Sequence, residues 1–389
     1  MSKLLAKNLI KSIQKVTRSK RSNLHEPIFY GEEIKLLKAC IRSNFVSTAG
    51  PQVEVFEKKI AKLTNSRYVV ACVNGTSALH LSLKLININR NCEVLLPSLN
   101  FVASANVIEY CGAVPHFIDS DRKTLGVNPE KLEKYLKKIC IVKGKFCFNK
   151  KTKRKISALI AVHIFGHPCN IIKIKKICKR FKITLIEDAA EGVGSFYHKK
   201  HVGTFGKIGV LSFNGNKTIT TGGGGALITN EKAMAQKAKL LSTTSKIPHL
   251  WKYDYDSVGY NYRLPNINSV IGIAQLNSLK KILKVKRNLF NKYKKELKKI
   301  DKIELFEEPK NCKSNYWLNT VLLKDNSFRA RDYLINEINK RGIQVRPCWK
   351  LLHKLKHFSK YPSMNLDEAE KLEMQIINIP SSPMYGKYK

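Results

Sequence analysis

The first candidate for chemistry is Lys217, which stands between an asparagine-rich turn and four consecutive glycines at 222–225, in the stretch SFNGNKTITTGGGGAL. Glycine gives the backbone conformations that side chains forbid and lets it approach a ligand closely. A lysine near glycines is nevertheless most often a solvated charge in a chain this basic. Two further residues favour chemistry, because Ser212 ends an apolar run five residues earlier and Asp188 ends another. The pattern predicts a bound ligand beside Lys217.

The candidate chemistry is that of pyridoxal phosphate. Asp188 ends the apolar stretch TLIED, where an unpaired carboxylate would be costly to bury and needs a cationic partner. A protonated pyridine nitrogen is such a partner, and a lysine that forms a Schiff base with an aldehyde is the other half of this chemistry. The phosphate needs donors, which Gly75, Thr76 and Ser77 offer at the start of a predicted helix, and Ser212 adds a hydroxyl.

Other residues give weaker signals. Phe101 follows a strand-like run, where its ring could stack on the pyridine, although a core phenylalanine is nearly as good an explanation. Asn261 and Arg263 lie in GYNYRLPN, which by itself is only a polar loop. The sequence has no GxGxxG before a helix, no GxxxxGK[ST], no HExxH and no GxSxG. These gaps disfavour enzymes that use nicotinamide or nucleoside triphosphates.

The elements that position these residues alternate between strand and helix from about 31 to 240. The runs RYVVAC, EVLLP, ISALIAV and ITLIED are short and apolar, and helical patterns separate them. This alternation predicts an α/β fold with a mostly parallel sheet flanked by helices, in which ligands bind beyond the carboxyl ends of the strands. The residues at these ends, which should converge on one crevice, are Gly75, Thr76, Asn100, Phe101, His163, Asp188 and Ser212.

The pattern changes after residue 270 to a long lysine-rich helix, then a strand in SNYWLNTVLLKD and a helix near 329–341. We predict a large cofactor-binding domain over 24–270, and a long connecting helix with a small C-terminal α+β domain over 271–389. Residues 1–23 hold seven basic and no acidic side chains, with apolar residues at helical spacing. We expect a basic N-terminal helix packed on its own domain, with a membrane-surface or targeting helix as the alternative.

Composition limits the class of protein. The formal net charge is +42, which by itself suggests nucleic acid or an anionic surface as a partner. The lysines are scattered through nearly every segment, so we expect mostly solvated faces and no nucleic-acid partner. The ten cysteines form no CxxC pair, which indicates neither a metal site nor a disulfide framework, and a reduced cytoplasmic location. No apolar run is long enough for membrane insertion.

Taken together, these motifs resemble those of the DegT-type (DegT/DnrJ/StrS) pyridoxal phosphate-dependent aminotransferases, which act on nucleotide-linked keto sugars. The resemblance covers about residues 24 to 382 and is carried by NGTSALHLSL, EDAAEGVGSFY, GTFGKIGVLSFNGNKTITTGGGGAL and GYNYRLPNINSVIG. It implies a fold-type I aminotransferase with a seven-stranded-type sheet. The stretches VHIFGHP and VRPCWKLLHKL are most similar to the branch that forms legionaminic acid and bacillosamine.

The resemblance implies a role for each matching residue. Lys217 matches the lysine that bonds to the cofactor and then moves the proton between cofactor and substrate carbon. Asp188 matches the partner of the pyridine nitrogen, and Phe101 matches the stacking ring. Glu191 lies at the position near the cofactor's phenolic oxygen where many relatives carry His or Gln, and Asn100 replaces a common threonine.

The remaining implied roles concern phosphate and substrate. Gly75, Thr76 and Ser212 match the phosphate-binding residues. Asn261 matches an asparagine that reaches the phosphate from the neighbouring subunit, which implies a homodimer with shared active sites. The candidates for substrate binding are Ser47, His163 and Arg263.

The implied activity is transamination at C4 of a UDP- or GDP-linked 4-keto-6-deoxy (N-acetylamino) sugar, with glutamate as the amino donor, in surface-glycan biosynthesis. A GDP-perosamine-type synthase is the alternative within the family. A nucleic-acid or anionic-surface binding protein is the alternative from another class, and a cofactor-bound regulator without turnover is a third.

Overall fold

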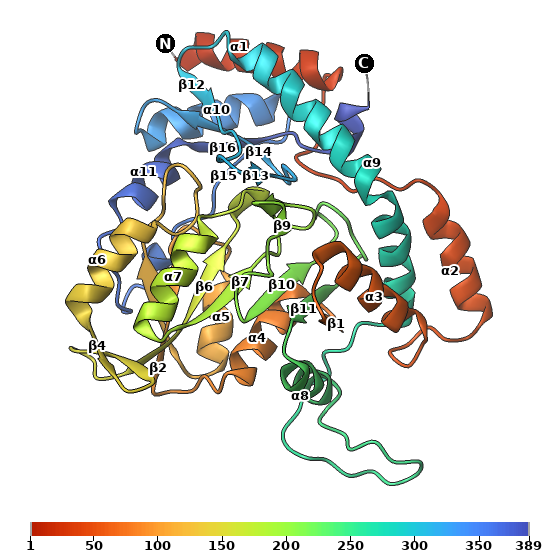
Figure 1. Cartoon of the computed structure of the whole chain (residues 1–389). Coiled ribbons are helices and arrows are strands. Elements are labelled where there is room, and N and C mark those ends of the chain that lie inside the picture. Colours follow the sequence, from red (N-terminus) through yellow and green to blue (C-terminus); the bar gives the residue numbers. More distant parts are fainter. Residues whose placement is uncertain (1, 388–389) are drawn as a thin grey trace.

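The computed structural model describes residues 2–387 and shows an α/β fold built on a nine-stranded mixed sheet (Figure 1). Seven strands follow the order β1-β11-β10-β7-β6-β2-β3, and the hairpin β4-β5 extends the sheet from β6. Along this order β11 runs against its neighbours and the other pairs are parallel. The mostly parallel sheet is therefore confirmed. The strands are β1 (Tyr68–Cys72), β2 (Cys92–Pro97), β3 (Val114–Ile118), β4 (Cys140–Lys143), β5 (Phe146–Asn149), β6 (Lys155–Val162), β7 (Thr184–Asp188), β10 (Ile208–Ser212) and β11 (Gly225–Thr229).

Helices cover both faces of this sheet, which explains why its strands are almost wholly apolar. In β6, Ile160 and Val162 belong to one core cluster and the alternate residues Leu159 and Ala161 belong to another, as the two-residue period of a strand requires. The first cluster includes residues of α4, α5 and α8, and the second includes residues of α6 and α7. The helices of this part of the chain are α2 (Glu32–Arg42), α3 (Gln52–Thr64), α4 (Gly75–Leu85), α5 (Ala103–Tyr110), α6 (Pro129–Ile139), α7 (Ile171–Phe181) and α8 (Lys232–Ser242).

The long helix predicted after residue 270 is α9 (Asn266–Leu297), which runs from the edge of the large sheet to the C-terminal part of the chain (Figure 1). A second sheet has the order β12-β14-β16-β15, and a small third sheet has the order β13-β8-β9. The elements of these parts are β8 (Phe196–Tyr197), β9 (Lys200–His201), β12 (Ile303–Leu305), β13 (Cys312–Lys313), β14 (Asn319–Leu323), α10 (Phe328–Lys340), β15 (Arg346–Pro347), α11 (Asp367–Gln375) and β16 (Ile376–Ile379).

The basic N-terminal segment forms α1 (Ser2–Thr17), which packs against α9 and α10. Leu9 and Ile13 are fully buried in the same cluster as Leu289 and Tyr293 of α9. The helix is thus integral to the C-terminal core, as the apolar spacing predicted. Residue 1, the first of the predicted segment 1–23, and residues 388 and 389, the last of the predicted segment 271–389, lie outside the described residues. Within residues 2–387 no helix combines the length and apolar character needed to cross a membrane.

Candidate active site

A cavity of about 360 Å³ lies at the carboxyl ends of the large sheet's strands. Both the large sheet and the C-terminal part contribute to its wall, because Trp317 precedes β14 and Trp349 follows β15. The residues that line it are Asn74, Gly75, Thr76, Leu79, Asn100, Phe101, Ala103, Ser104, Val162, Asp188, Ala190, Glu191, Ser212, Asn214, Asn216, Lys217, Trp317 and Trp349. Most of the residues predicted to bind a cofactor therefore meet in one place.

One wall of the cavity is the N-terminus of α4. Asn74 caps this helix, and its side chain accepts the N–H of Ser77 at 2.7 Å. The Ser77 N–H, predicted as a phosphate donor, is thus already used, whereas the earlier N–H groups of a helix have no partner inside the helix. A Cβ on Gly75 would lie only 3.0 Å from the Cβ of Ser212. Glycine therefore lets the helix start lie against the Ser212 hydroxyl, and together they form a concave site suited to an anion.

The four glycines at 222–225 do not line the cavity, contrary to the expectation that they approach the ligand directly. Gly225 starts β11 and pairs with Ser212 and Cys72. A Cβ on Gly225 would lie 2.4 Å from the carbonyl carbon of Asn74, so a side chain there would push the start of α4 away. Gly222 has a φ of 82°, which disfavours other residues. Gly225 therefore acts one layer behind the site, by letting β11 pack against the start of α4.

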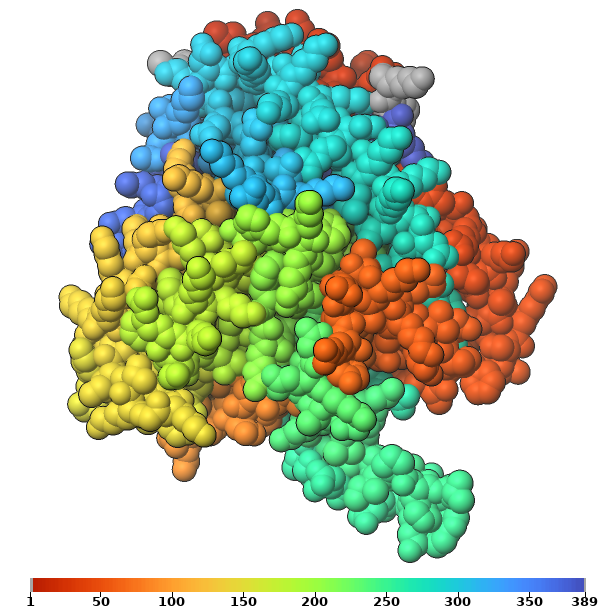
Figure 2. Space-filling view, in the orientation of Figure 1, coloured from red at the N-terminus to blue at the C-terminus, as the bar shows by residue number. Residues whose placement is uncertain are grey.

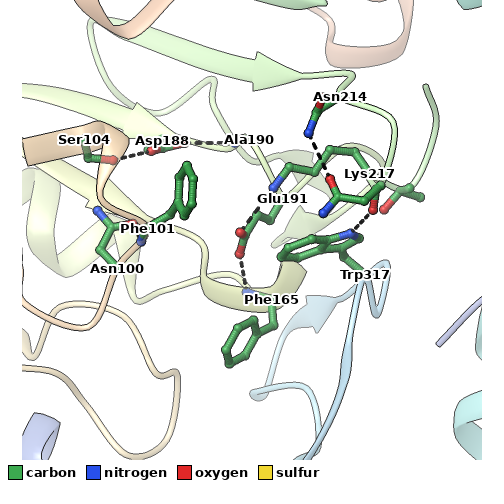
Figure 3. Close-up of polar contacts among 12 residues, drawn as sticks. Asn100, Phe101, Ser104, Phe165, Asp188, Ala190, Glu191, Asn214, Lys217 and Trp317 are labelled. Atoms are coloured by element: carbon green, nitrogen blue, oxygen red, sulfur yellow. Dashed lines mark hydrogen bonds and ion pairs between the residues drawn. The ribbon is translucent and has the colours of Figure 1, made fainter. Parts of the chain in front are cut away.

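Asp188 ends β7 with its carboxylate at the cavity (Figure 3). Its Oδ2 accepts the Ser104 hydroxyl at 2.8 Å, and its Oδ1 accepts the Ala190 N–H at 3.1 Å. Burial raises the pKa of the Asp188 carboxyl, and these hydrogen bonds and the charge of Lys217 oppose that rise. A buried carboxylate held on one side by neutral donors can bind a cation on its open side.

Lys217 lies over the indole ring of Trp317, with its Nζ 3.9 Å from the ring centroid (Figure 3). The same Nζ is 3.3 Å from Oε1 of Glu191. Only 14% of the Lys217 side chain is exposed, so this amine is shielded from solvent, unlike most lysines of the chain. Phe101 also lines the cavity, and its ring centroid is 6.1 Å from that of Trp349.

Five predicted residues lie elsewhere in this chain or serve other contacts. Ser77 is used in the cap, and His163 is fully buried behind the cavity, where its Nε2 is 3.0 Å from Oε2 of Glu187. Ser47 is exposed and its carbonyl accepts the N–H of Asn266 at the start of α9. Arg263 lines a separate cavity near α3, and Asn261 is exposed in the loop after α8. The structure does not bring these side chains to the cavity of their own chain.

Among the cavity residues that went unpredicted are Ser104, Trp317 and Trp349. The serine lies three residues after the predicted Phe101, at the start of α5, which is a signal that the strand-end argument could have used. The tryptophans lie about 100 residues or more beyond Lys217 in sequence, and no local pattern connects them to it. Asn100, at the cavity, has its Oδ1 on the N–H of Phe101 at 2.7 Å. Its buried Nδ2 has no hydrogen-bond partner within residues 2–387, so a donor is open to a ligand.

Comparison with known proteins identifies the family. The DegT/DnrJ/EryC1/StrS aminotransferase family matches residues 28–387. The chain belongs to this family. It is 34% identical to the GDP-perosamine synthase of Escherichia coli O157:H7, over 92% of this chain and 93% of the relative. It is 36% identical to the putative pyridoxal phosphate-dependent aminotransferase EpsN of Bacillus subtilis, over 86% of this chain and 83% of the relative.

Solved structures agree with the fold-type I assignment. The aminotransferase TlmJ from Streptoalloteichus hindustanus is 25% identical with a TM-score of 0.83, covering 92% of this chain and 93% of that one. A family member from Brucella abortus is 26% identical with a TM-score of 0.82, covering 91% of each chain. The predicted family and enzyme class are thus confirmed, and pyridoxal phosphate is the cofactor of this family.

The cavity fits this cofactor. Asp188 offers a buried carboxylate for the ring nitrogen, and the Gly75–Ser212 contact leaves a concave anion site at the start of α4. The unpartnered Nδ2 of Asn100 adds a donor. Lys217 presents a shielded amine to the same cavity. Charge, donors and amine are therefore all present in one cavity.

Proposed function

We propose that this aminotransferase transfers an amino group to C4 of a nucleotide-linked 4-keto-6-deoxy sugar, with glutamate as the donor. The observation that carries the proposal is that Lys217, Asp188 and the Gly75–Ser212 anion site share one cavity. A structural lysine would need no buried carboxylate and no anion site nearby. The family supports the reaction type, because its members are aminotransferases that use the chemistry of pyridoxal phosphate.

The residues divide the work by chemical type. Bound pyridoxal phosphate supplies an aldehyde that captures amines and a ring that withdraws electrons. Asp188 keeps a proton on the ring nitrogen by charge pairing, and the start of α4 with Ser212 holds the phosphate. Lys217 provides the amine at Nζ and, when released, carries a proton at that atom. Phe101 and Trp349 form an aromatic side of the cavity.

A GDP-linked sugar is the first candidate substrate. Proteins named GDP-perosamine synthase from Escherichia coli O157:H7, Vibrio cholerae and Caulobacter vibrioides are 34%, 33% and 32% identical over 92%, 92% and 93% of this chain. A UDP-linked N-acetylamino sugar of the legionaminic acid and bacillosamine branch is the second candidate. The sequence stretches VHIFGHP and VRPCWKLLHKL favour it.

The test is to incubate the purified protein with glutamate and a panel of GDP- and UDP-linked 4-keto-6-deoxy sugars, with mass detection of the amino sugar. Wild type should show the visible absorbance of the bound cofactor and form product. Lys217→Ala should lose both, whereas Lys207→Ala, which changes a partly exposed lysine beside β10, should keep both. A wild-type protein that binds no cofactor would refute the proposal, and product from one nucleotide alone would decide the substrate.

We further propose that the enzyme is a homodimer in which Asn261 completes the partner's site. The segment between α8 and α9 projects from the body of the molecule (Figures 1 and 2). Its large apolar side chains are exposed to an extent unusual for a monomer, with Leu250 at 97%, Val258 at 86%, Tyr253 at 77% and Trp251 at 70%. A second copy of the chain would cover them.

Complementation tests this arrangement. Lys217→Ala and Asn261→Ala should each be inactive or nearly so when made alone. Co-expression should restore activity to about a quarter of wild type, because half of randomly assembled dimers are mixed and each mixed dimer has one intact site. No recovery in mixed dimers, isolated with two different tags, would show that each chain uses its own Asn261.

A further inference from the structure

The ε-amine of Lys217 is enclosed by two side chains that the reaction chemistry does not itself require. We propose that Glu191 and Trp317 form a holding site for this amine whenever it is not bonded to the cofactor. In it, the Glu191 carboxylate pairs with the protonated amine and accepts its proton when Lys217 must act as a nucleophile or base, and Trp317 keeps solvent away. This rests on the role of Lys217 in the proposed function. The two groups approach Nζ at 3.3 Å (Oε1) and 3.9 Å (indole centroid).

Both walls of the holding site are fixed by hydrogen bonds. Oε2 of Glu191 accepts the N–H of Phe165 at 2.7 Å, which leaves Oε1 to face the amine. The indole Nε1–H of Trp317 donates to the carbonyl of Asn216 at 2.7 Å, one residue before the lysine (Figure 3). Neither wall can therefore turn away without losing a bond, so the geometry is preset.

A third contact joins the two walls. The N–H of Trp317 donates to Oδ1 of Asn315 at 2.8 Å, and Nδ2 of Asn315 donates to the carbonyls of Glu191 at 2.7 Å and Val193 at 2.9 Å. Asn315 thus connects the C-terminal part of the chain to the loop after β7. Trp317 is 4% exposed, and packing alone would be enough to bury it. Packing alone would not require the hydrogen bonds that tie Trp317 both to Asn216, beside the lysine, and through Asn315 to Glu191.

The proton transfer is chemically balanced. An ammonium group has no lone pair, so Lys217 must lose a proton before it can act as a nucleophile or base. In the proposed step an Nζ–H bond breaks and an Oε1–H bond forms on Glu191, and the reverse step returns the proton. Burial raises the pKa of the Glu191 carboxyl, and the charge of Lys217 and the Phe165 N–H oppose the rise. A carboxyl whose pKa is raised is a better acceptor for this proton than an ordinary glutamate.

Other titratable groups near the pair come from three elements. Asp188 on β7 interacts with both Lys217 and Glu191. His25, in the segment after α1, interacts with the charge of Lys217, and it is held neutral because burial and the charges of Lys286 on α9 and of Lys217 lower its pKa. Asp188 is therefore the competing acidic group, and its hydrogen bonds to Ser104 and Ala190 favour its ionised form.

The test uses cofactor-free protein and competitive labelling with trace acetic anhydride. Peptide mass spectrometry follows acetylation of Lys217 from pH 6 to 10, with exposed Lys11 as the internal reference. In Glu191→Gln, the amide oxygen can still accept the Phe165 N–H but the negative charge is gone. The labelling curve should move to lower pH, with about a tenfold higher rate at neutral pH, because an adjacent opposite charge favours the ammonium form. Glu54→Gln, which removes an exposed partner of Lys58, should leave the Lys217 curve unchanged.

Trp317 is tested by a pair of variants. Trp317→Leu removes the ring and should raise acetylation of Lys217 at every pH, because solvent and reagent reach the amine. Trp317→Phe keeps an aromatic face and should restore most of the protection. A Lys217 curve within twofold of wild type in both Glu191→Gln and Trp317→Leu, with each variant shown to be folded by its unfolding transition, would overturn the inference. Because no cofactor or sugar is present, this failure would be distinct from failure of the proposed function.

Discussion

Ser104 offers a sharp test of how the site controls Asp188. Its hydroxyl donates to Oδ2 of the carboxylate at 2.8 Å, and the side chain is 1% exposed. The change Ser104→Ala removes one of the two donors while the Ala190 N–H remains. Ser104→Thr keeps a hydroxyl at the same carbon and is the matched control. The perturbation therefore acts on the stability of the ionised form of Asp188.

The size of the effect follows from the hydrogen bond that is lost. A hydrogen bond to a charged group contributes about 1.5–3 kcal/mol, and one to a neutral group about 1 kcal/mol. The ionised carboxylate therefore loses roughly 0.5–2 kcal/mol more than the neutral form. Since 1.4 kcal/mol corresponds to about one pH unit, the acid limb of the pH–rate profile should move up by about one unit. The direction adds to the rise in the pKa of Asp188 that burial already causes.

Two measurements check this reasoning. The rate with glutamate alone, followed by cofactor absorbance in single turnovers, gives the acid limb for wild type, Ser104→Ala and Ser104→Thr. Equilibrium binding of pyridoxal phosphate at several pH values shows whether the same group governs affinity. A Ser104→Ala profile that superimposes on wild type at its acid limb would show that the hydroxyl does not support the charge of Asp188.

Three further outcomes are expected. Gly225→Ala should weaken cofactor binding at least tenfold, because its Cβ would overlap the Asn74 carbonyl carbon at 2.4 Å; Gly215→Ala, with its nearest atom at 3.6 Å, is the control, and equal dissociation constants would contradict the packing role of the glycines. Burial lowers the pKa of His201 to about 4, so the unfolded state binds more protons than the folded state below about pH 6.5. The free energy of unfolding should therefore decrease as pH falls from about 6.5 toward 4, by about 3 kcal/mol in all. Between pH 7 and 5 the free energy of unfolding, measured with denaturant, should decrease less steeply in His201→Gln than in wild type, and identical slopes would count against this. Ile13→Ala should lower the free energy of unfolding by about 2–4 kcal/mol, against almost no change for the exposed Lys11→Ala; a small loss would mean that α1 is dispensable.

The strand ends could be predicted from sequence because both signals are local. Asp188 and Ser212 each end a five-residue strand that is buried over its last four residues or more, and the parallel arrangement of β7 and β10 then places those ends side by side. The same reasoning placed Thr76 and Phe101 at the cavity. The prediction for His163 ignored the direction of its side chain. His163 directly follows the end of β6, but its ring points into the interior toward Glu187 of β7.

Other features depend on contacts that no window of sequence contains. Trp317 reaches Lys217 because the C-terminal sheet packs over the large one, and its contact cannot be inferred from SNYWLN alone. The glycine run invited a ligand-binding interpretation, whereas Gly225 is required by the backbone of Asn74, which is remote in sequence. The hairpin β4-β5 also went unpredicted, since its alternation is short and broken by lysines.

The contact between Gly75 and Ser212 has a consequence for how the enzyme matures. The two halves of the anion site come from opposite ends of the large sheet's sequence, and β11 must insert between β1 and β10 before they meet. The last wall, Trp349, leaves the ribosome later still. A nascent chain thus has no complete pocket for pyridoxal phosphate, and the cofactor can bind only after nearly the whole polypeptide has left the ribosome.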